Sequence, residues 1–154
     1  MKFILSFLLL TFSYTVLAQQ APEHIGKYTK KIETSEGVTF EYNLTLNHNG
    51  TFLFHYFDDK DAKYDVLNKN GKGKNQYGKG TWISNGKVIS LKAIESIDID
   101  KTHTLNLNKS KGRYITKSPR DKSDRVIEDA ILIYDSGIPW VKRLKLIKTN
   151  KKED

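Results

Sequence analysis

The stretch FEYNLTLNHNGTFLFHY, residues 40–56, decides the fold. Large apolar residues alternate with polar ones, which is the period of two that is typical of a strand with one buried face. The alternation is interrupted by a three-residue loop at 48–50, whose glycine can take a left-handed backbone conformation. Pairing across this loop sets Leu46 opposite Phe52, so that both strands place their large side chains on one face. The stretch therefore predicts an antiparallel hairpin.

A second hairpin is predicted by GKGTWISNGKVISLKA, residues 78–93. Its Asn-Gly pair at 85–86 is the preferred sequence for a two-residue turn. With that turn, Trp82 lies opposite Ile89 on the apolar face. The side chains that we expect to point inward from the two hairpins are Leu44, Phe52, Phe54, Trp82, Ile89 and Leu91.

The rest of the chain shows the same kind of pattern, with turns at short and regular intervals. Consecutive strands joined in this way are expected to be antiparallel neighbours. The elements predicted are a first strand in IGKYTKKI (25–32), a third hairpin in 102–117 with its turn at Lys109 to Gly112, a charged loop at Ser118 to Asp129, and two closing strands in 130–149 around a turn at Asp135 to Pro139. Whether Ser96 to Asp100 adds a ninth strand stays open at this point.

These segments predict an all-β domain of about eight strands, because no stretch shows a convincing helical period longer than two turns. A single antiparallel up-and-down barrel removes the exposed edges that such a sheet would otherwise present. A two-sheet β-sandwich is the alternative.

The chain opens with MKFILSFLLLTFSYTVLAQQ, which has the charged, apolar and small-residue order of a secretory signal. We expect a signal peptide at residues 1–18, a barrel domain at 19–149 and a charged tail at 150–154. The apolar run is shorter than the roughly 20 residues that cross a bilayer, and we expect no transmembrane segment in the mature chain. Export predicts a secreted or periplasmic protein. The chain has no cysteine, so its core alone must hold the fold.

Four short motifs resemble small secreted lipocalin-like (calycin-type) domains of bacterial envelopes. They are Gly26-Lys27-Tyr28, LTLNHNGTF at 44–52, GKGTW at 78–82 and NGKVISL at 85–91. The resemblance covers about half of the mature chain, and it departs from the lipocalin pattern at Tyr28, where tryptophan is usual. It implies a barrel with an internal cavity or core, and a function in ligand binding or envelope interaction. It implies no catalytic residue.

The stretch GKGKNQYGKGT, residues 71–81, nearly matches a nucleotide-binding loop. Such a loop must lead into a helix whose amide groups hold the phosphates, but this one leads into a strand, and Gly80 replaces the hydroxyl residue that binds magnesium. We therefore interpret residues 65–79 as a basic inter-strand loop. Its candidate anion-binding residues are Lys72, Lys74 and Lys79.

A candidate ligand site is formed by the aromatic inner face. An eight-stranded barrel is just wide enough to be filled by side chains or to hold one small ligand, and both interpretations stay open. No histidine pair, calcium-loop pattern or nucleophile motif points to a metal site, a cofactor or a catalytic residue. The ligand-binding candidates are Tyr42, Phe54, Tyr56, Trp82 and His103.

Two function classes follow from these features. The first is an exported, non-enzymatic binding protein that holds a small apolar or amphipathic ligand in the barrel. The second is a basic envelope protein that binds an anionic protein, polysaccharide or lipid surface through its loops, because the chain has a net charge of +8. Nothing in the sequence points to a specific nucleic acid. Salt separates the two classes, since ionic binding weakens as salt rises.

Overall fold

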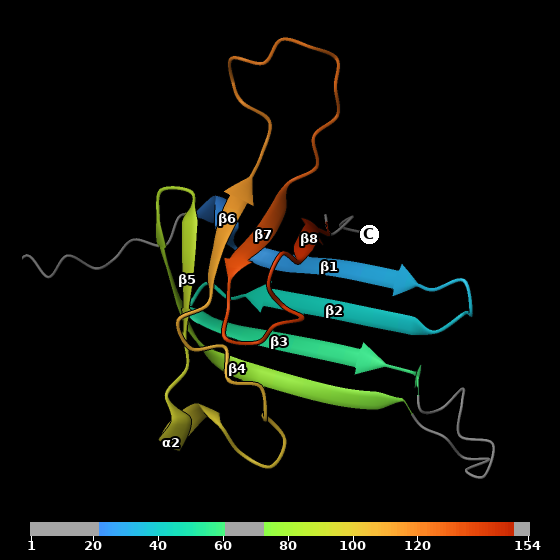
Figure 1. Ribbon diagram of the computed structural model, residues 1–154. Coiled ribbons are helices and arrows are strands. Elements are labelled where there is room, and N and C mark those ends of the chain that lie inside the picture. Colours follow the sequence, from blue (N-terminus) through green and yellow to red (C-terminus); the bar gives the residue numbers. More distant parts are fainter. Residues whose placement is uncertain (1–21, 61–72, 150–154) are drawn as a thin grey trace, which may run out of the picture.

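The computed structural model describes residues 22–60 and 73–149. Eight antiparallel strands follow one another around a closed barrel, which is the up-and-down architecture predicted from the sequence (Figure 1). The predicted signal peptide and tail, and Lys72, lie outside the described residues. The elements are a 3-10 turn η1 (Pro22–His24), β1 (Gly26–Glu33), β2 (Thr39–Leu46), β3 (Thr51–Asp58), β4 (Lys74–Asn85), β5 (Val88–Lys92), a short helix α2 (Glu95–Asp98), β6 (Lys111–Ile115), β7 (Ala130–Asp135) and β8 (Lys145–Lys148).

The first predicted hairpin is confirmed in strands and register. Leu46 pairs with Phe52, as expected from the loop length. Gly50 has φ +80°, the left-handed conformation that glycine takes without steric cost. The side chain of Asn49 accepts hydrogen bonds from the backbone N–H of Thr51 at 3.1 Å and from its hydroxyl at 2.7 Å, which holds the loop closed.

The second hairpin forms, but its predicted register is wrong by two residues. Trp82 pairs with Leu91, and Ile89 pairs with Ser84, so the two loop residues are Gly86 and Lys87. Gly86 has φ +55°, as expected for glycine at the first central position of a type II′ turn. A shift of two residues leaves every side chain on its predicted face, because side chains alternate with a period of two.

The prediction for residues 102–112 is wrong. Ser96 to Asp100 adds no ninth strand, because the chain forms α2 there, and residues 103–110 form an irregular connection in place of a hairpin strand. Leu105 and Leu107 are nevertheless buried, so their alternation reflects burial alone. Room for them exists because Gly78 has no side chain: a Cβ there would lie 2.8 Å from the Leu105 carbonyl oxygen and from a methyl group of Leu107.

Three other connections complete the comparison with the sequence. β4 begins at Lys74, so the predicted loop at 65–79 is wrong for residues 74–79, and the rest of it up to residue 72 lies outside the described residues. The predicted charged loop is confirmed, and it projects away from the barrel between β6 and β7 (Figure 1). The closing strands exist, but their connection spans 136–144 and is longer than predicted.

The barrel interior is filled by large side chains from every strand. All six side chains predicted to point inward are buried. The largest side chains that are less than 2% exposed are Trp82, Tyr28, Phe52, Phe54, Leu44, Leu46, Ile89, Leu107, Ile131, Ile133, Leu146 and His24.

The strands differ in length, and this gives the barrel its shape. β1 to β4 have 8 to 12 residues and run past the shorter β5 to β8, so that the long strands form a sheet extending to one side (Figure 1). The closing seam between β1 and β8 is short, with Tyr28 paired to Lys148 and Thr29 to Ile147. One more backbone bond follows, from the Thr149 N–H to the Lys27 carbonyl oxygen at 2.8 Å. Among the described residues, no helix is long and apolar enough to cross a membrane.

Candidate functional site

An aromatic cluster lies on the inner face of the long sheet, where the short strands no longer cover it. The Tyr42 and Tyr56 rings are 5.2 Å apart, and the Trp140 ring lies over them, 4.5 Å from Tyr56 and 6.2 Å from Tyr42. Phe54 lies 6.4 Å from Trp140. Trp140 is 39% exposed, whereas Tyr42 and Phe54 are buried. The indole ring of Trp140 therefore contacts buried aromatic residues on one side and solvent on the other.

Trp140 is held by the connection between β7 and β8. Its neighbours Ile138 and Val141 pack against the core, and the Val141 side chain is fully buried. The N–H of Val141 bonds the Ile138 carbonyl oxygen at 3.0 Å, and the N–H of Ile138 bonds the Ser136 hydroxyl at 3.2 Å. Because residues on both sides are anchored, the indole ring is fixed over the tyrosines while one side remains exposed.

The hydroxyl groups of the cluster are those of Tyr42 and Tyr56. The Tyr56 hydroxyl donates a hydrogen bond to the Asp58 carboxylate at 3.1 Å. Burial raises the pKa of Tyr56, and the nearby Asp58 charge raises it further. Burial, followed by Asp58, also raises the pKa of Tyr42. Both phenols thus remain neutral at physiological pH, and the cluster presents a flat, mostly apolar surface with hydroxyl groups at its edge.

The structure brings together three of the five predicted ligand-binding residues: Tyr42, Phe54 and Tyr56. Trp82 lies apart, where its indole N–H donates to the Asn47 carbonyl oxygen at 3.1 Å. Sequence reasoning missed Trp140, since its position over the sheet depends on contacts between strands distant in sequence. Its one local signal was a tryptophan placed directly after Pro139 in a predicted turn.

His103, a predicted ligand-binding residue of the inner face, does not point into the barrel. It belongs to the irregular connection after α2, where its Nδ1 lies 3.0 Å from both carboxylate oxygens of Asp100. Asp100 also accepts a bond from the Lys79 ammonium at 2.9 Å. The backbone bond from His103 lowers the pKa of Asp100 most, followed by the Lys79 and His103 side chains. Asp100 and His103 thus lie in a surface connection that is bonded to Lys79 of β4, outside the aromatic cluster.

The predicted anion-binding residues are not gathered in a loop. Lys74 and Lys79 both belong to β4, and Lys79 is occupied by Asp100. Lys72 lies outside the described residues. The expected loop is therefore wrong for Lys74 and Lys79, because strand pairing with β3 begins at Lys74. Anion binding by these lysines stays a prediction.

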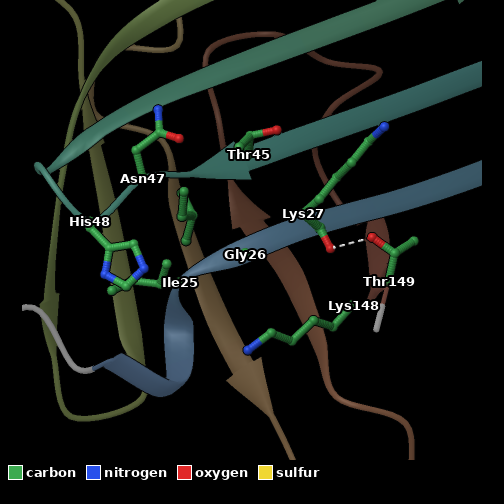
Figure 2. A pocket seen from close by; sticks show the side chains of 9 residues that line it. Ile25, Gly26, Lys27, Thr45, Asn47, His48, Lys148 and Thr149 are labelled. Atoms are coloured by element: carbon green, nitrogen blue, oxygen red, sulfur yellow. Dashed lines mark hydrogen bonds between the residues drawn. The ribbon is translucent and has the colours of Figure 1, made fainter. Parts of the chain in front are cut away.

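A surface pocket of about 770 Å³ lies where β1 begins and where β2 and β8 end (Figure 2). Its lining combines apolar Ile25 and Leu46 with the cationic or titratable Lys27, His48 and Lys148. Figure 2 shows Lys148 extending toward Ile25, while the Lys27 amine points the opposite way. The Lys148 ammonium is already bonded to a backbone carbonyl oxygen at 2.6 Å. The pocket thus lies outside the barrel and is separate from the aromatic cluster.

His24 is a buried titratable group at this end of the barrel. Its side chain is fully buried, its ring lies 4.6 Å from that of Tyr114, and neither ring nitrogen makes a hydrogen bond to the described residues. Burial lowers the pKa of His24; the Glu23 carboxylate, 3.5 Å away, opposes this effect and the Lys148 charge adds to it. The neutral imidazole packs here as an aromatic ring.

Comparison of the chain with protein-family models, with curated protein sequences and with solved structures found no significant match.

Proposed function

We propose that the protein is an exported, non-enzymatic binding protein, and that it holds a small apolar or amphipathic ligand on the aromatic cluster. The observation that carries the proposal is Trp140, an indole ring that is fixed over Tyr42 and Tyr56 and is still 39% exposed. A ligand that stacks against this ring would gain apolar contact without disturbing the barrel.

The position of the cluster also explains why the ligand would not enter the closed part of the barrel. Trp82, Phe52 and Tyr28 fill that region and are at most 2% exposed. The lipocalin-like resemblance implies binding inside a barrel, and we propose that this chain uses the uncovered inner face of its long sheet instead. Partly exposed Ile32 belongs to the same face, because it pairs with Phe40 one strand away.

The two tryptophans allow a direct test by fluorescence. In Trp82→Phe, Trp140 is the sole indole, and we expect the neutral probe N-phenyl-1-naphthylamine to quench or shift its emission in a saturable way. In Trp140→Phe, the buried Trp82 is the sole indole, and we expect little response. Trp140→Ala should weaken binding at least roughly tenfold, which corresponds to about 1.4 kcal/mol of lost contact.

Tyr134→Ala is the matched control, since Tyr134 is also a partly exposed aromatic residue, at 42%, but lies on β7 away from the cluster. It should leave binding of the probe unchanged. Saturable binding that survives both Trp140→Ala and Tyr56→Ala would place the ligand elsewhere. Failure of every apolar probe, including a long-chain fatty acid, to bind would refute the proposed function.

A further inference from the structure

The outer face of the four short strands carries one continuous row of alternating apolar and cationic residues. Val88 of β5 pairs with Arg113 of β6, which pairs with Leu132 of β7, which in turn pairs with Lys145 of β8. All four point outward, because their neighbours along each strand are the buried core residues. Since the four strands are adjacent in the barrel, this row crosses one side of the molecule (Figure 1).

A second row lies beside the first and adds one apolar and one cationic residue. Ile83 of β4, which is 55% exposed, pairs with Ser90 of β5, and Ser90 pairs with Lys111 of β6. One carboxylate belongs to this row, because Lys111 pairs with Asp135 of β7. Partly exposed Tyr134 precedes that aspartate at an irregularity in the strand pairing. We call the two rows together the basic face.

The cations of the basic face are not drawn into ion pairs within the described part of the chain. Among the described residues, none of Lys111, Arg113 and Lys145 forms an ion pair, although Lys79 and Arg125 elsewhere do. One acidic residue against three unpaired cations leaves the face positive. A positive surface of this kind attracts anions over roughly a Debye length.

We propose that the basic face docks on an anionic lipid surface. The apolar residues favour a membrane over a soluble polyanion. A phosphate or sulfate chain offers no apolar surface for the side chains of Val88, Leu132 and Ile83 that lie between the cations. At a lipid interface those side chains would enter the headgroup region while the cations meet lipid phosphates. The basic face shares no residue with the aromatic cluster. An experiment can therefore refute membrane docking without refuting ligand binding, and the reverse.

Vesicle flotation tests this proposal with the exported protein, which we expect to lack residues 1–18. Vesicles of phosphatidylcholine containing 30% phosphatidylglycerol should bind the protein, and pure phosphatidylcholine vesicles should not. Each basic residue near an anionic surface contributes about 1 kcal/mol, or roughly fivefold, so Arg113→Gln/Lys145→Gln should weaken binding roughly 25-fold. Ile83→Ser should weaken it further, since that substitution removes an apolar contact without changing the charge.

The matched control is Lys60→Gln/Lys101→Gln, which removes two exposed lysines that lie outside the basic face. It should retain vesicle binding. Circular dichroism of each variant establishes that the barrel is folded, as expected for exposed positions. Equal binding to neutral vesicles, or full binding by Arg113→Gln/Lys145→Gln, would overturn the proposal. So would binding to heparin that depends on the same two cations while anionic vesicles stay unbound.

Discussion

Replacing Trp82 by alanine tests most directly which face of β4 points into the barrel. The indole is 1% exposed, and its N–H donates to the Asn47 carbonyl oxygen at 3.1 Å. A side chain of this size buries about 150–250 Å², which at about 25 cal/mol per Å² corresponds to roughly 4–6 kcal/mol of transfer free energy. Alanine keeps part of that area and the cavity collapses in part, so we expect unfolding to become easier by about 3–5 kcal/mol.

Urea unfolding followed by circular dichroism measures this loss without depending on tryptophan emission. The midpoint of thermal unfolding should fall by about 12–20 °C for a domain of this size. Trp82→Phe keeps most of the volume and removes one of the two donors to the Asn47 carbonyl oxygen, since the Gly50 N–H remains at 3.1 Å; it should cost about 1–2 kcal/mol. Ile83→Ala is the matched control for the outer face of β4, because Ile83 points outward, and it should stay within about 0.5 kcal/mol of the parent. If Ile83→Ala costs more than Trp82→Ala, the assigned faces of β4 are wrong.

Three further outcomes follow from single residues. Gly80→Ala should destabilise the barrel by about 1–3 kcal/mol in urea unfolding, because Gly80 has φ +156° and an added Cβ would overlap a backbone carbonyl oxygen of β5; unchanged stability would contradict that geometry. Stability should decline as the pH falls below 6.5, because burial lowers the pKa of His24 and the unfolded chain therefore binds a proton at higher pH than the folded chain. His24→Gln should flatten this decline in urea unfolding, whereas His48→Gln on the exposed loop should not. Lys79→Ala should cost at most about 1 kcal/mol, because its bond to Asp100 is solvent-exposed, and a larger loss would show that the pair is structural.

The first hairpin could be predicted in full because its strands and its loop lie within 17 residues, and because loop length and alternation agree. The second hairpin could be predicted only as far as its faces. A turn at Asn85-Gly86 and a turn at Gly86-Lys87 place the same side chains inside, so the apolar pattern does not distinguish between them. The backbone conformation of Gly86 determines which of the two turns forms, and this conformation cannot be predicted from the sequence alone.

The misplaced elements depend on contacts between distant residues. Leu105 and Leu107 alternate as in a strand, but they pack beside Gly78, and no local pattern connects a glycine with a segment about 30 residues later. The same reasoning applies to the candidate site. Tyr42 and Tyr56 were recognisable as an inward pair, whereas Trp140 reaches them from a connection almost 100 residues away.

The short seam between β1 and β8 has a consequence for how the barrel assembles and opens. β1 to β4 form through local hairpins, but the seam joins Tyr28 to Lys148, so nearly the whole described chain must be ordered before those two strands meet. In the described part of the chain, the hydrogen bonds across this seam come from two residue pairs, from the Thr149 N–H, and from the Lys148 and Thr149 side chains, which donate to the Glu23 and Lys27 carbonyl oxygens. We expect closure to be the last step of folding. The seam amides should exchange with solvent sooner than the amides between β2 and β3, because local opening of the barrel begins where β1 separates from β8.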